Sequence, residues 1–347
     1  MVFSYYLKNI PYCVIWQLLA LIRKPRQIVL YCADVKDWFV FNFLVKKYEN
    51  TIVVAKNSKT KKELKQLGVI SKTCWVFPGL VVMARHAFHK FPCRKIKLVG
   101  MRHGPYHFKR MIGVQKYNFF DLYIFTSRYE LDQAIKLGIN SGAAGGYPKL
   151  DPAFDGTITR SDIMRLRGAL GFDRKPVIIF TATWEKSGLS SVSKWYKRVG
   201  ELIGKYNVLV TLHPWVKKSV WVRIESTPRV VLIRDPNILP YLMLADIMIG
   251  DTSSILAEFC ALKKPMITFK VEVKDRLDKE LANIIASISV QVDEFDQLIP
   301  SIEYLLKHRD ELTPAQEWAN NKMFLPLDGK HKEHCLTLID GLISSIE

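Results

Sequence analysis

Short apolar runs alternate with helical patterns along almost the whole chain, and this alternation constrains the fold more than any other feature. Residues 121–127 (DLYIFTS) and 175–183 (KPVIIFTAT) are nearly uninterrupted strand patterns, with a Gly-rich stretch between them at 139–154. Strands without polar alternation are buried on both faces, and their alternation with helices predicts parallel sheets. We therefore expect an α/β fold with two domains facing a central cleft, an N-terminal domain at 27–150 and a C-terminal domain at 151–347.

Two motifs that often accompany such Rossmann-like domains are absent from the sequence. It contains no G-x-G-x-x-G and no G-x-x-x-x-G-K-[ST], which argues against a nicotinamide cofactor or a P-loop nucleotide. The formal net charge of +18 favours an anionic partner, either nucleic acid, a phosphorylated substrate or an acidic membrane face. Because no zinc-finger or RNP signature is present, we expect no nucleic acid partner.

The six cysteines predict reduced thiols in a cytosolic protein. No two of them show C-x-x-C spacing, and most lie in apolar runs, so neither a disulfide framework nor a zinc site is expected. The HKEH run at 331–334 has no further ligands at a suitable spacing. We therefore predict no metal ion held by the protein itself.

The first 26 residues form a separate segment. Its apolar part, 10–22, is shorter than the roughly 20 residues of an ordinary membrane span, and it lacks a small-residue cleavage site. Aromatic and aliphatic residues dominate it, and Lys8 and Arg23 stand on either side. This pattern is typical of a helix that lies in the membrane interface, and the alternative is a first helix packed on the domain core.

Polar residues directly after strands are the candidate site residues, because ligands of open α/β sheets bind beyond the carboxyl ends of the strands. Runs 73–79 (TCWVFPG) and 95–101 (KIKLVGM) are predicted strands, and His103 follows the second. A neutral imidazole there can take a proton from a hydroxyl near pH 7, although a histidine that caps a loop fits the pattern too. His213 follows the strand 207–212, and we expect the two histidines to meet across the cleft.

Four polar residues follow the apolar run 246–250, namely Asp251, Thr252, Ser253 and Ser254. A helix start needs one capping residue, so capping accounts for only part of this group. Free N–H groups and hydroxyls at a helix start predict an anion site. Glu258 lies one turn further on, where it can accept hydrogen bonds from a ribose.

Further strand-end and loop residues complete the predicted nucleotide-binding set. Two hydroxyls lie at the end of the strand 175–183, and the tryptophan after them can stack on a base or pack in the core. A basic loop near residue 330 offers a phosphate contact or is simply solvated. These candidates are Thr181, Thr183, Trp184 and Lys330.

These motifs, in this order, resemble those of the CDP-glycerol:poly(glycerophosphate) glycerophosphotransferases, the polymerases and primases of teichoic acid and related capsule synthesis. The resemblance extends from about residue 95 to the end of the chain. It rests on His103-Gly104, GYPKLD at 146–151, TATW at 181–184, LHP at 212–214, DTSS at 251–254 with Glu258, and DGK at 328–330.

The resemblance implies a GT-B fold, a CDP-linked donor in the C-terminal domain and an acceptor site in the N-terminal domain. It further implies monotopic attachment to the cytoplasmic face of the membrane. His103 would deprotonate an acceptor hydroxyl, CMP would leave, and His213 with the Ser-rich helix start would stabilise the pyrophosphate. Mg²⁺ could enter bound to the donor phosphates. The expected acceptor-binding residues are Arg102, Gly104, His107, Lys109 and Arg110.

The chain departs from the family pattern around the predicted base. Arg102 stands where the family usually has tryptophan, and the residues after His103-Gly104 differ as well. We expect transfer of a polyol phosphate, with glycerol phosphate first, to a lipid-linked or glycan acceptor in surface-polymer synthesis. The alternatives are a GT-B glycosyltransferase that uses a nucleotide sugar and a basic binding protein without catalysis.

Overall fold

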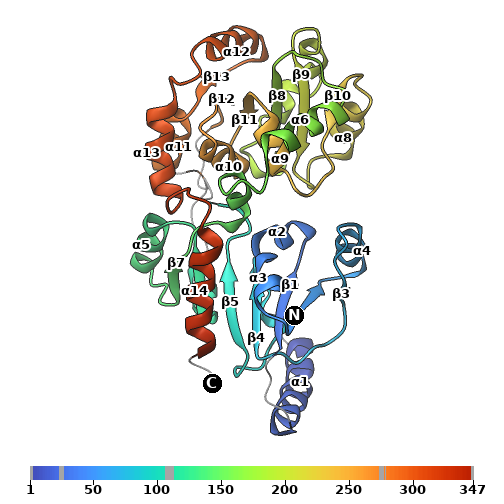
Figure 1. Cartoon of the computed structure of the whole chain (residues 1–347), viewed down its shortest axis with the longest axis vertical. Helices are drawn as coiled ribbons and strands as arrows, with labels where there is room; N and C mark the ends of the chain where they lie inside the picture. The colour runs from blue at the N-terminus through green and yellow to red at the C-terminus, as the bar shows by residue number, and fades with distance from the viewer. Residues whose placement is uncertain (1–2, 23–26, 106–112, 273–276, 278, 345–347) are drawn as a thin grey trace. The chain divides into compact units, whose positions relative to one another are not determined.

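The computed structural model describes residues 3–22, 27–105, 113–272, 277 and 279–344. The chain divides into two compact units, each built around its own sheet (Figure 1). The first unit combines most of the first 149 residues with the segment from Lys330 onward. The second consists of Leu150–Gly329 together with Gly104 and Pro105. The residues from Lys330 onward thus belong to the first unit, whereas the expected C-terminal domain extended from 151 to 347.

A seven-stranded parallel sheet with the order β3-β2-β1-β4-β5-β6-β7 forms the centre of the first unit. The central strands are runs of branched aliphatic residues that are buried along their whole length, as expected for strands covered on both faces. Its strands are β1 (Ile28–Cys32), β2 (Thr51–Ala55), β3 (Ser71–Lys72), β4 (Leu80–Met83), β5 (Lys97–Met101), β6 (Leu122–Phe125) and β7 (Gly142–Ala144).

The helices of the first unit begin at polar caps where the sequence provides them. Asn57 accepts a hydrogen bond from the Thr60 N–H at the start of α4, and Ser127 accepts one from the Glu130 N–H at the start of α5. The helices are α1 (Phe3–Ile22), α2 (Trp38–Phe41), α3 (Phe43–Lys47), α4 (Ser58–Gln66), α5 (Arg128–Lys136) and α14 (His331–Ser344).

The C-terminal helix α14 packs against β6, although it follows the second unit in the sequence. Gly146 permits this packing, because it has φ +87° and a Cβ there would lie 2.3–2.9 Å from the His331 side chain. Cys335 Sγ also contacts the Gly145 carbonyl oxygen at 3.4 Å. Gly146 of the GYPKLD motif and Gly145 before it therefore have a structural reason, which is the close approach of this helix.

A six-stranded parallel sheet with the order β10-β9-β8-β11-β12-β13 forms the second unit. Its strands are β8 (Val177–Ala182), β9 (Asn207–Leu212), β10 (Val230–Leu232), β11 (Ile247–Gly250), β12 (Met266–Phe269) and β13 (Val290–Val292). Phe180 of β8 and Trp195 pack together, with ring centroids 4.8 Å apart, in the core between the sheet and its helices.

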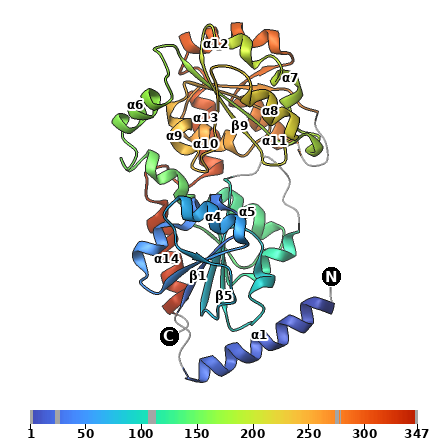
Figure 2. The same ribbon diagram turned by 90° about the vertical axis from the view of Figure 1, so that its right-hand side faces the viewer.

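Helices surround the second sheet (Figure 2). Thr159 and Asp162 form a capping box at the start of α6. The helices are α6 (Arg160–Ala169), α7 (Val192–Trp195), α8 (Lys218–Glu225), α9 (Leu239–Leu244), α10 (Ile255–Ala261), α11 (Lys279–Ser287), α12 (Leu298–Lys307) and α13 (Thr313–Met323).

The strand orders determine which loops are neighbours at the carboxyl ends of the sheets. In the first unit, β1, β4 and β5 are adjacent, so the residues after Cys32, Met83 and Met101 come together. In the second unit, β9, β8 and β11 are adjacent, so the residues after Leu212, Ala182 and Gly250 come together. Both groups of loops carry the polar residues described next.

Candidate active site

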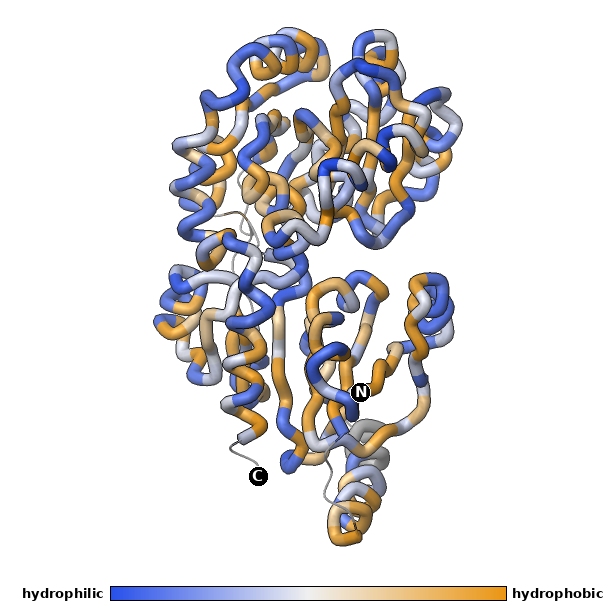
Figure 3. Tube along the Cα trace, viewed as in Figure 1, coloured by the Kyte–Doolittle hydropathy of each residue, from blue (hydrophilic) through white to orange (hydrophobic). Residues whose placement is uncertain are grey.

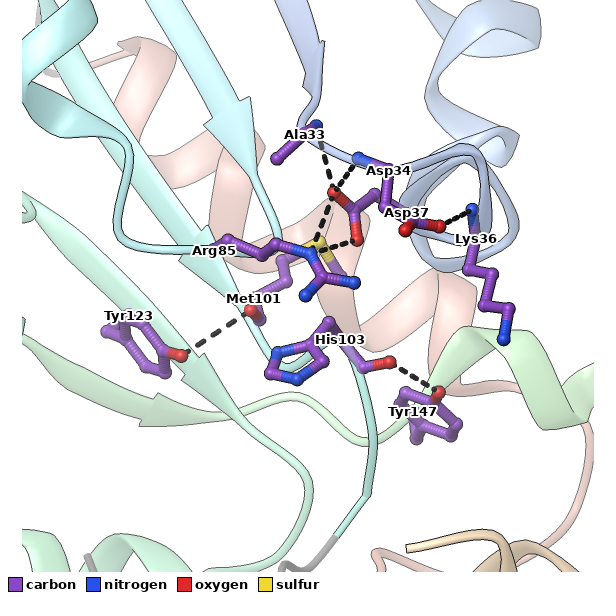
Figure 4. A network of polar contacts seen from close by, with 9 residues as sticks. All are labelled: Ala33, Asp34, Lys36, Asp37, Arg85, Met101, His103, Tyr123 and Tyr147. Carbon is purple, nitrogen blue, oxygen red and sulfur yellow. Dashed lines mark hydrogen bonds and ion pairs between the residues drawn. The ribbon is translucent and has the colours of Figure 1, made fainter. Parts of the chain in front are cut away.

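His103 lies just after β5, at the position where a general base is expected (Figure 4). The residue is exposed, and its backbone carbonyl accepts a hydrogen bond from Tyr147 Oη at 3.4 Å. Desolvation by the surrounding protein lowers the pKa of His103, and the positive charges of Arg85 and Arg102 lower it further. Because the residue keeps contact with solvent, the fall is smaller than full burial would cause. The imidazole is therefore neutral at pH 7 and can accept a proton.

An ion pair between Asp37 and Arg85 lies beside His103 (Figure 4). The Asp37 carboxylate is fully buried and accepts the backbone N–H groups of Ala33 and Asp34, both at 3.0 Å. Arg85 Nε donates to both carboxylate oxygens, at 3.0 and 3.3 Å. Desolvation raises the pKa of Asp37 to about 6 against the opposing effect of Arg85, so the carboxylate is ionised at pH 7.

The sequence analysis did not select Asp37 or Arg85. The available signal was their position, since Asp37 lies five residues beyond Cys32 at the end of β1 and Arg85 lies two beyond Met83 at the end of β4. The second signal was hidden because the predicted strand at 73–79 is not a strand in the structure, and β4 begins only after it.

Arg102, which was expected to contact the acceptor, makes several contacts within the first unit. It is 8% exposed, it forms an ion pair with Glu130 of α5, and its Nη1 donates to Tyr117 Oη at 3.2 Å. Its guanidinium also lies over the Phe125 ring, 5.6 Å from the centroid. Arg102 therefore connects α5 with the sheet inside the first unit, and its charge is paired there with Glu130.

The other expected acceptor-binding residues are not placed by the structure. His107, Lys109 and Arg110 lie outside the described residues. Gly104 is described and buried. Their contact with the acceptor stays a prediction.

Asp251 connects the loops after β8 and β11 in the second unit. It is 1% exposed, and its carboxylate accepts the backbone N–H groups of Thr183 at 3.0 Å, Ser191 at 2.9 Å and Thr252 at 2.6 Å. Three buried backbone donors thus depend on one side chain for their hydrogen bonds. Asp251 is a support for the strand-end loops rather than a helix cap.

The hydroxyls at the start of α10 divide into two kinds. Thr252 is buried, and its hydroxyl donates to the Leu189 carbonyl oxygen at 3.3 Å. Ser253 and Ser254 are half-buried, and Ser253 Oγ accepts from the Ile255 N–H at 3.4 Å. The two serines are therefore the hydroxyls that keep access to solvent, whereas Thr252 is used within the fold.

An aromatic cluster follows β8 and β9. The rings of Trp184 and His213 are stacked with centroids 6.3 Å apart, and the Trp215 ring lies edge-on to both. The backbone N–H of Trp215 donates to His213 Nδ1 at 3.2 Å. In the neutral imidazole, Nδ1 is then the acceptor and Nε2 carries the proton. Trp215, which is 69% exposed, was not selected from the sequence.

The remaining predicted donor residues are buried in the second unit or belong to the first unit. Thr181 is 1% exposed within β8, and its Cγ2 would lie 2.9 Å from a Cβ at Gly250. Glu258 is 3% exposed on α10. Lys330 is exposed and belongs to the first unit. The structure therefore brings Trp184 together with His213, and Asp251 together with Thr183 and Thr252.

Comparison with known proteins connects the strand ends of the second unit to one family. A model of the CDP-glycerol:poly(glycerophosphate) glycerophosphotransferase family matches residues 116–340. The teichoic acid glycerol-phosphate primase of Bacillus subtilis (strain 168) is 24% identical over 208 residues, covering 57% of this chain and 51% of the primase. The teichoic acid ribitol-phosphate polymerase TarK of Staphylococcus aureus (strain NCTC 8325 / PS 47) is 26% identical over 139 residues. The match covers 38% of this chain and 27% of TarK.

Solved structures show the same fold over nearly the whole chain. A structure of a variant of the wall teichoic acid polymerase TagF superposes with a TM-score of 0.70 at 15% identity, covering 99% of this chain and 98% of the other. The predicted fold class of two Rossmann-like domains with parallel sheets is thereby confirmed. The chain spans about half the length of the curated primase that it matches.

Proposed function

This chain belongs to the CDP-glycerol:poly(glycerophosphate) glycerophosphotransferase family, and we propose that it transfers a polyol phosphate from a CDP-linked donor to an acceptor hydroxyl, releasing CMP. Glycerol phosphate is the first candidate for the transferred group, and the acceptor is a lipid-linked or glycan end in surface-polymer synthesis. The observation that carries the proposal is the family match, which covers the strand-end residues of the whole second unit. A TagF structure soaked with CDPG has the same fold, with a TM-score of 0.65.

His103 performs the proton transfer in the proposed mechanism. Its neutral imidazole takes the proton of the acceptor hydroxyl while that oxygen attacks the donor phosphorus next to the polyol. The bond between this phosphorus and the bridging pyrophosphate oxygen breaks, and CMP leaves with the electron pair. The products are a new phosphodiester, CMP and a protonated His103, which then releases its proton to solvent.

The second unit holds the donor in this mechanism. Nε2–H of His213 and the hydroxyls of Ser253 and Ser254 are donors that fit the pyrophosphate oxygens, where negative charge increases as CMP leaves. Trp184 offers a ring face for the base. Asp251 stabilises the loops that carry these groups through its three backbone contacts.

Identification of the released nucleotide tests the proposal. The full chain is incubated with CDP-glycerol, CDP-ribitol and a panel of nucleotide sugars in the presence of a hydroxyl acceptor, and the nucleotide products are separated by chromatography. We expect CMP from a CDP-linked polyol and no reaction of the nucleotide sugars. Release of CDP or UDP together with sugar transfer would identify a glycosyltransferase instead. Turnover of none of the donors would favour a binding protein.

We further propose that α1 attaches the protein to the cytoplasmic face of the membrane, through one apolar side. Tyr12 and Trp16 are buried, and they donate to the carbonyl oxygens of Val76 and Pro78 at 2.6 and 2.7 Å, which holds α1 on the first unit. Figure 3 shows that hydrophobic residues recur along the α1 trace. Several of its apolar residues are exposed, namely Ile10, Val14, Leu18, Leu19, Leu21 and Ile22, with exposed fractions from 45% to 85%.

This arrangement supports the proposed attachment, because α1 packs on the domain and keeps an apolar side in solvent. Trp75, 55% exposed and 5.8 Å from the Tyr12 ring, continues the apolar surface onto the unit. Among the described residues, no helix is long and apolar enough to cross a membrane. An apolar side on a protein of net charge +18 fits a surface of anionic lipid.

Liposome binding by a triple variant tests this attachment. Replacement of Leu18, Leu21 and Ile22 by serine leaves Tyr12 and Trp16 in place, so α1 stays docked while its apolar side is lost. We expect the partition coefficient on phosphatidylglycerol liposomes, measured by sedimentation, to fall about 10- to 100-fold.

The matched control replaces three other exposed apolar residues by serine, namely Ile135, Met164 and Val222, each between 55% and 56% exposed. This variant should bind liposomes like the wild-type protein. Equal binding by the wild-type protein and the α1 variant would contradict the attachment through α1.

A further inference from the structure

Arg85 has a guanidinium that is only partly used by the protein. In the described part of the chain, its polar contacts are those of Nε with the two Asp37 oxygens, at 3.0 and 3.3 Å. The two terminal amino groups have no such partner there, and the side chain is 38% exposed. Figure 4 shows the guanidinium beside the imidazole of His103. A cationic group with free donors thus stands next to the candidate base.

Asp37 holds this guanidinium in one orientation. The carboxylate is completely buried and also accepts the N–H groups of Ala33 and Asp34, so its own position is determined by the turn after β1. Nε is bound to Asp37, and neither terminal amino group makes a hydrogen bond with that carboxylate in the described part of the chain. A planar group with two parallel donors matches two oxygens of a phosphate. Arg85 is therefore preorganised for an anion before any ligand arrives.

Among the described residues, Arg102 is the other guanidinium whose charge acts on His103, and it does not offer the same contact. Arg102 is buried and paired with Glu130, so its charge is used within the unit. The negative charge of Asp37 is shared among three donors and does not cancel the hydrogen-bonding capacity of the terminal amino groups of Arg85. An anion near His103 would therefore contact Arg85.

We propose that Arg85 binds a phosphate of the acceptor that lies next to the attacking hydroxyl, with Asp37 as its positioning residue. The inference rests on the proposed function and specifies its acceptor as an anionic phosphate ester rather than a neutral sugar. Each transfer of glycerol phosphate leaves a chain end with a hydroxyl a few bonds from a phosphodiester. With the phosphate on Arg85, that hydroxyl is directed to His103, which orders the two reacting groups.

A pair of matched acceptors tests this assignment in the full chain. One is a short alkyl ester of sn-glycerol 3-phosphate, and the other is an alkyl glycerol ether without the phosphate. Replacement R85M is expected to raise the KM of the phosphate acceptor about 10- to 100-fold, the loss of a charge-assisted contact, and to leave the neutral acceptor within about twofold. The KM of the phosphate acceptor in R85K should lie between those of the wild-type protein and R85M. Lysine keeps the positive charge but loses the two parallel N–H donors of arginine. D37N should raise the same KM to a smaller extent.

The control is R94A, which removes one exposed positive charge in the loop before β5. This loop lies at the amino-terminal end of the strand, whereas His103 follows its carboxyl end. It should change neither KM. Circular dichroism and thermal unfolding establish whether each variant is folded. If R85M is unfolded, R85K replaces it in the KM comparison of the two acceptors. An equal loss with both acceptors in R85M would overturn the proposal, because Arg85 would then support His103 and not the acceptor phosphate.

A binding measurement separates this inference from the proposed function. sn-Glycerol 3-phosphate, without any donor, is titrated into protein carrying ¹³C-labelled histidine, and the His103 signal is assigned with H103Q. We expect a shift of that signal in the wild-type protein and R94A, and none in R85M. If the wild-type protein consumes no CDP-linked donor, the proposed function is rejected. The titration still tests whether Arg85 binds a phosphate in that case. An equal response to inorganic phosphate, with no kinetic discrimination between the acceptors, would overturn the assignment to an acceptor.

Discussion

Replacement of His103 by alanine is expected to lower kcat for transfer by about 10²- to 10⁴-fold, the usual contribution of a general base. Donor affinity should stay within about twofold, because His103 belongs to the first unit and the proposed donor contacts belong to the second. The measurements are steady-state CMP release and equilibrium binding of the CDP-linked donor. In the wild-type protein the pKa of His103 lies below its ordinary value, so protonation of the base should lower kcat/KM only below about pH 6.5.

The matched control is His89, an exposed histidine of the same unit. His89→Ala should release CMP at the wild-type rate. Unchanged turnover in His103→Ala would show that another group accepts the proton, and the assignment of the base would then be abandoned.

Replacement of Asp251 by alanine is expected to have the largest effect on stability. It removes the acceptor for the buried N–H groups of Thr183, Ser191 and Thr252, and each unsatisfied donor costs about 1–3 kcal/mol. We expect a loss of more than about 3 kcal/mol in the free energy of unfolding of the second unit, measured by urea denaturation. Donor affinity should fall as well, because the loops after β8 and β11 lose their connection.

Asp251→Asn and Asp310→Ala are the comparisons for this experiment. Asparagine keeps one carbonyl oxygen, so its loss of stability should be smaller than that of alanine. Asp310 is exposed in the loop after α12, and its replacement should leave unfolding unchanged. Equal midpoints for Asp251→Ala and the wild-type protein would show that the three backbone donors find other partners.

The sequence predicted most strands because their residues are apolar along the whole run. The runs at 175–183 and 121–127 correspond to β8 and β6, each within two residues at either end. The prediction of a strand at 73–79 was wrong, because β4 begins only at Leu80, after Pro78. A proline interrupts a ladder of hydrogen bonds, and the shorter run LVVM behind it was the better candidate.

Several candidate residues at strand ends make hydrogen bonds or ion pairs within the fold. Thr252 and Asp251 follow β11 as predicted, yet both side chains make hydrogen bonds within the fold. Arg102 follows β5 and pairs with Glu130. A sequence identifies polar residues at strand ends, but it does not show which of them are satisfied by their own backbone.

By itself the sequence determined the two parallel α/β units and the strand ends at which polar residues collect, because these follow from local hydrophobic patterns. It also placed His103 and His213 directly after their strands. Only the tertiary structure decided that Asp37 and Arg85, 48 residues apart, form an ion pair beside His103. The same holds for α14, which returns to the first unit and packs on Gly146. Such contacts depend on strand order, and strand order is a property of the whole sheet rather than of any local segment.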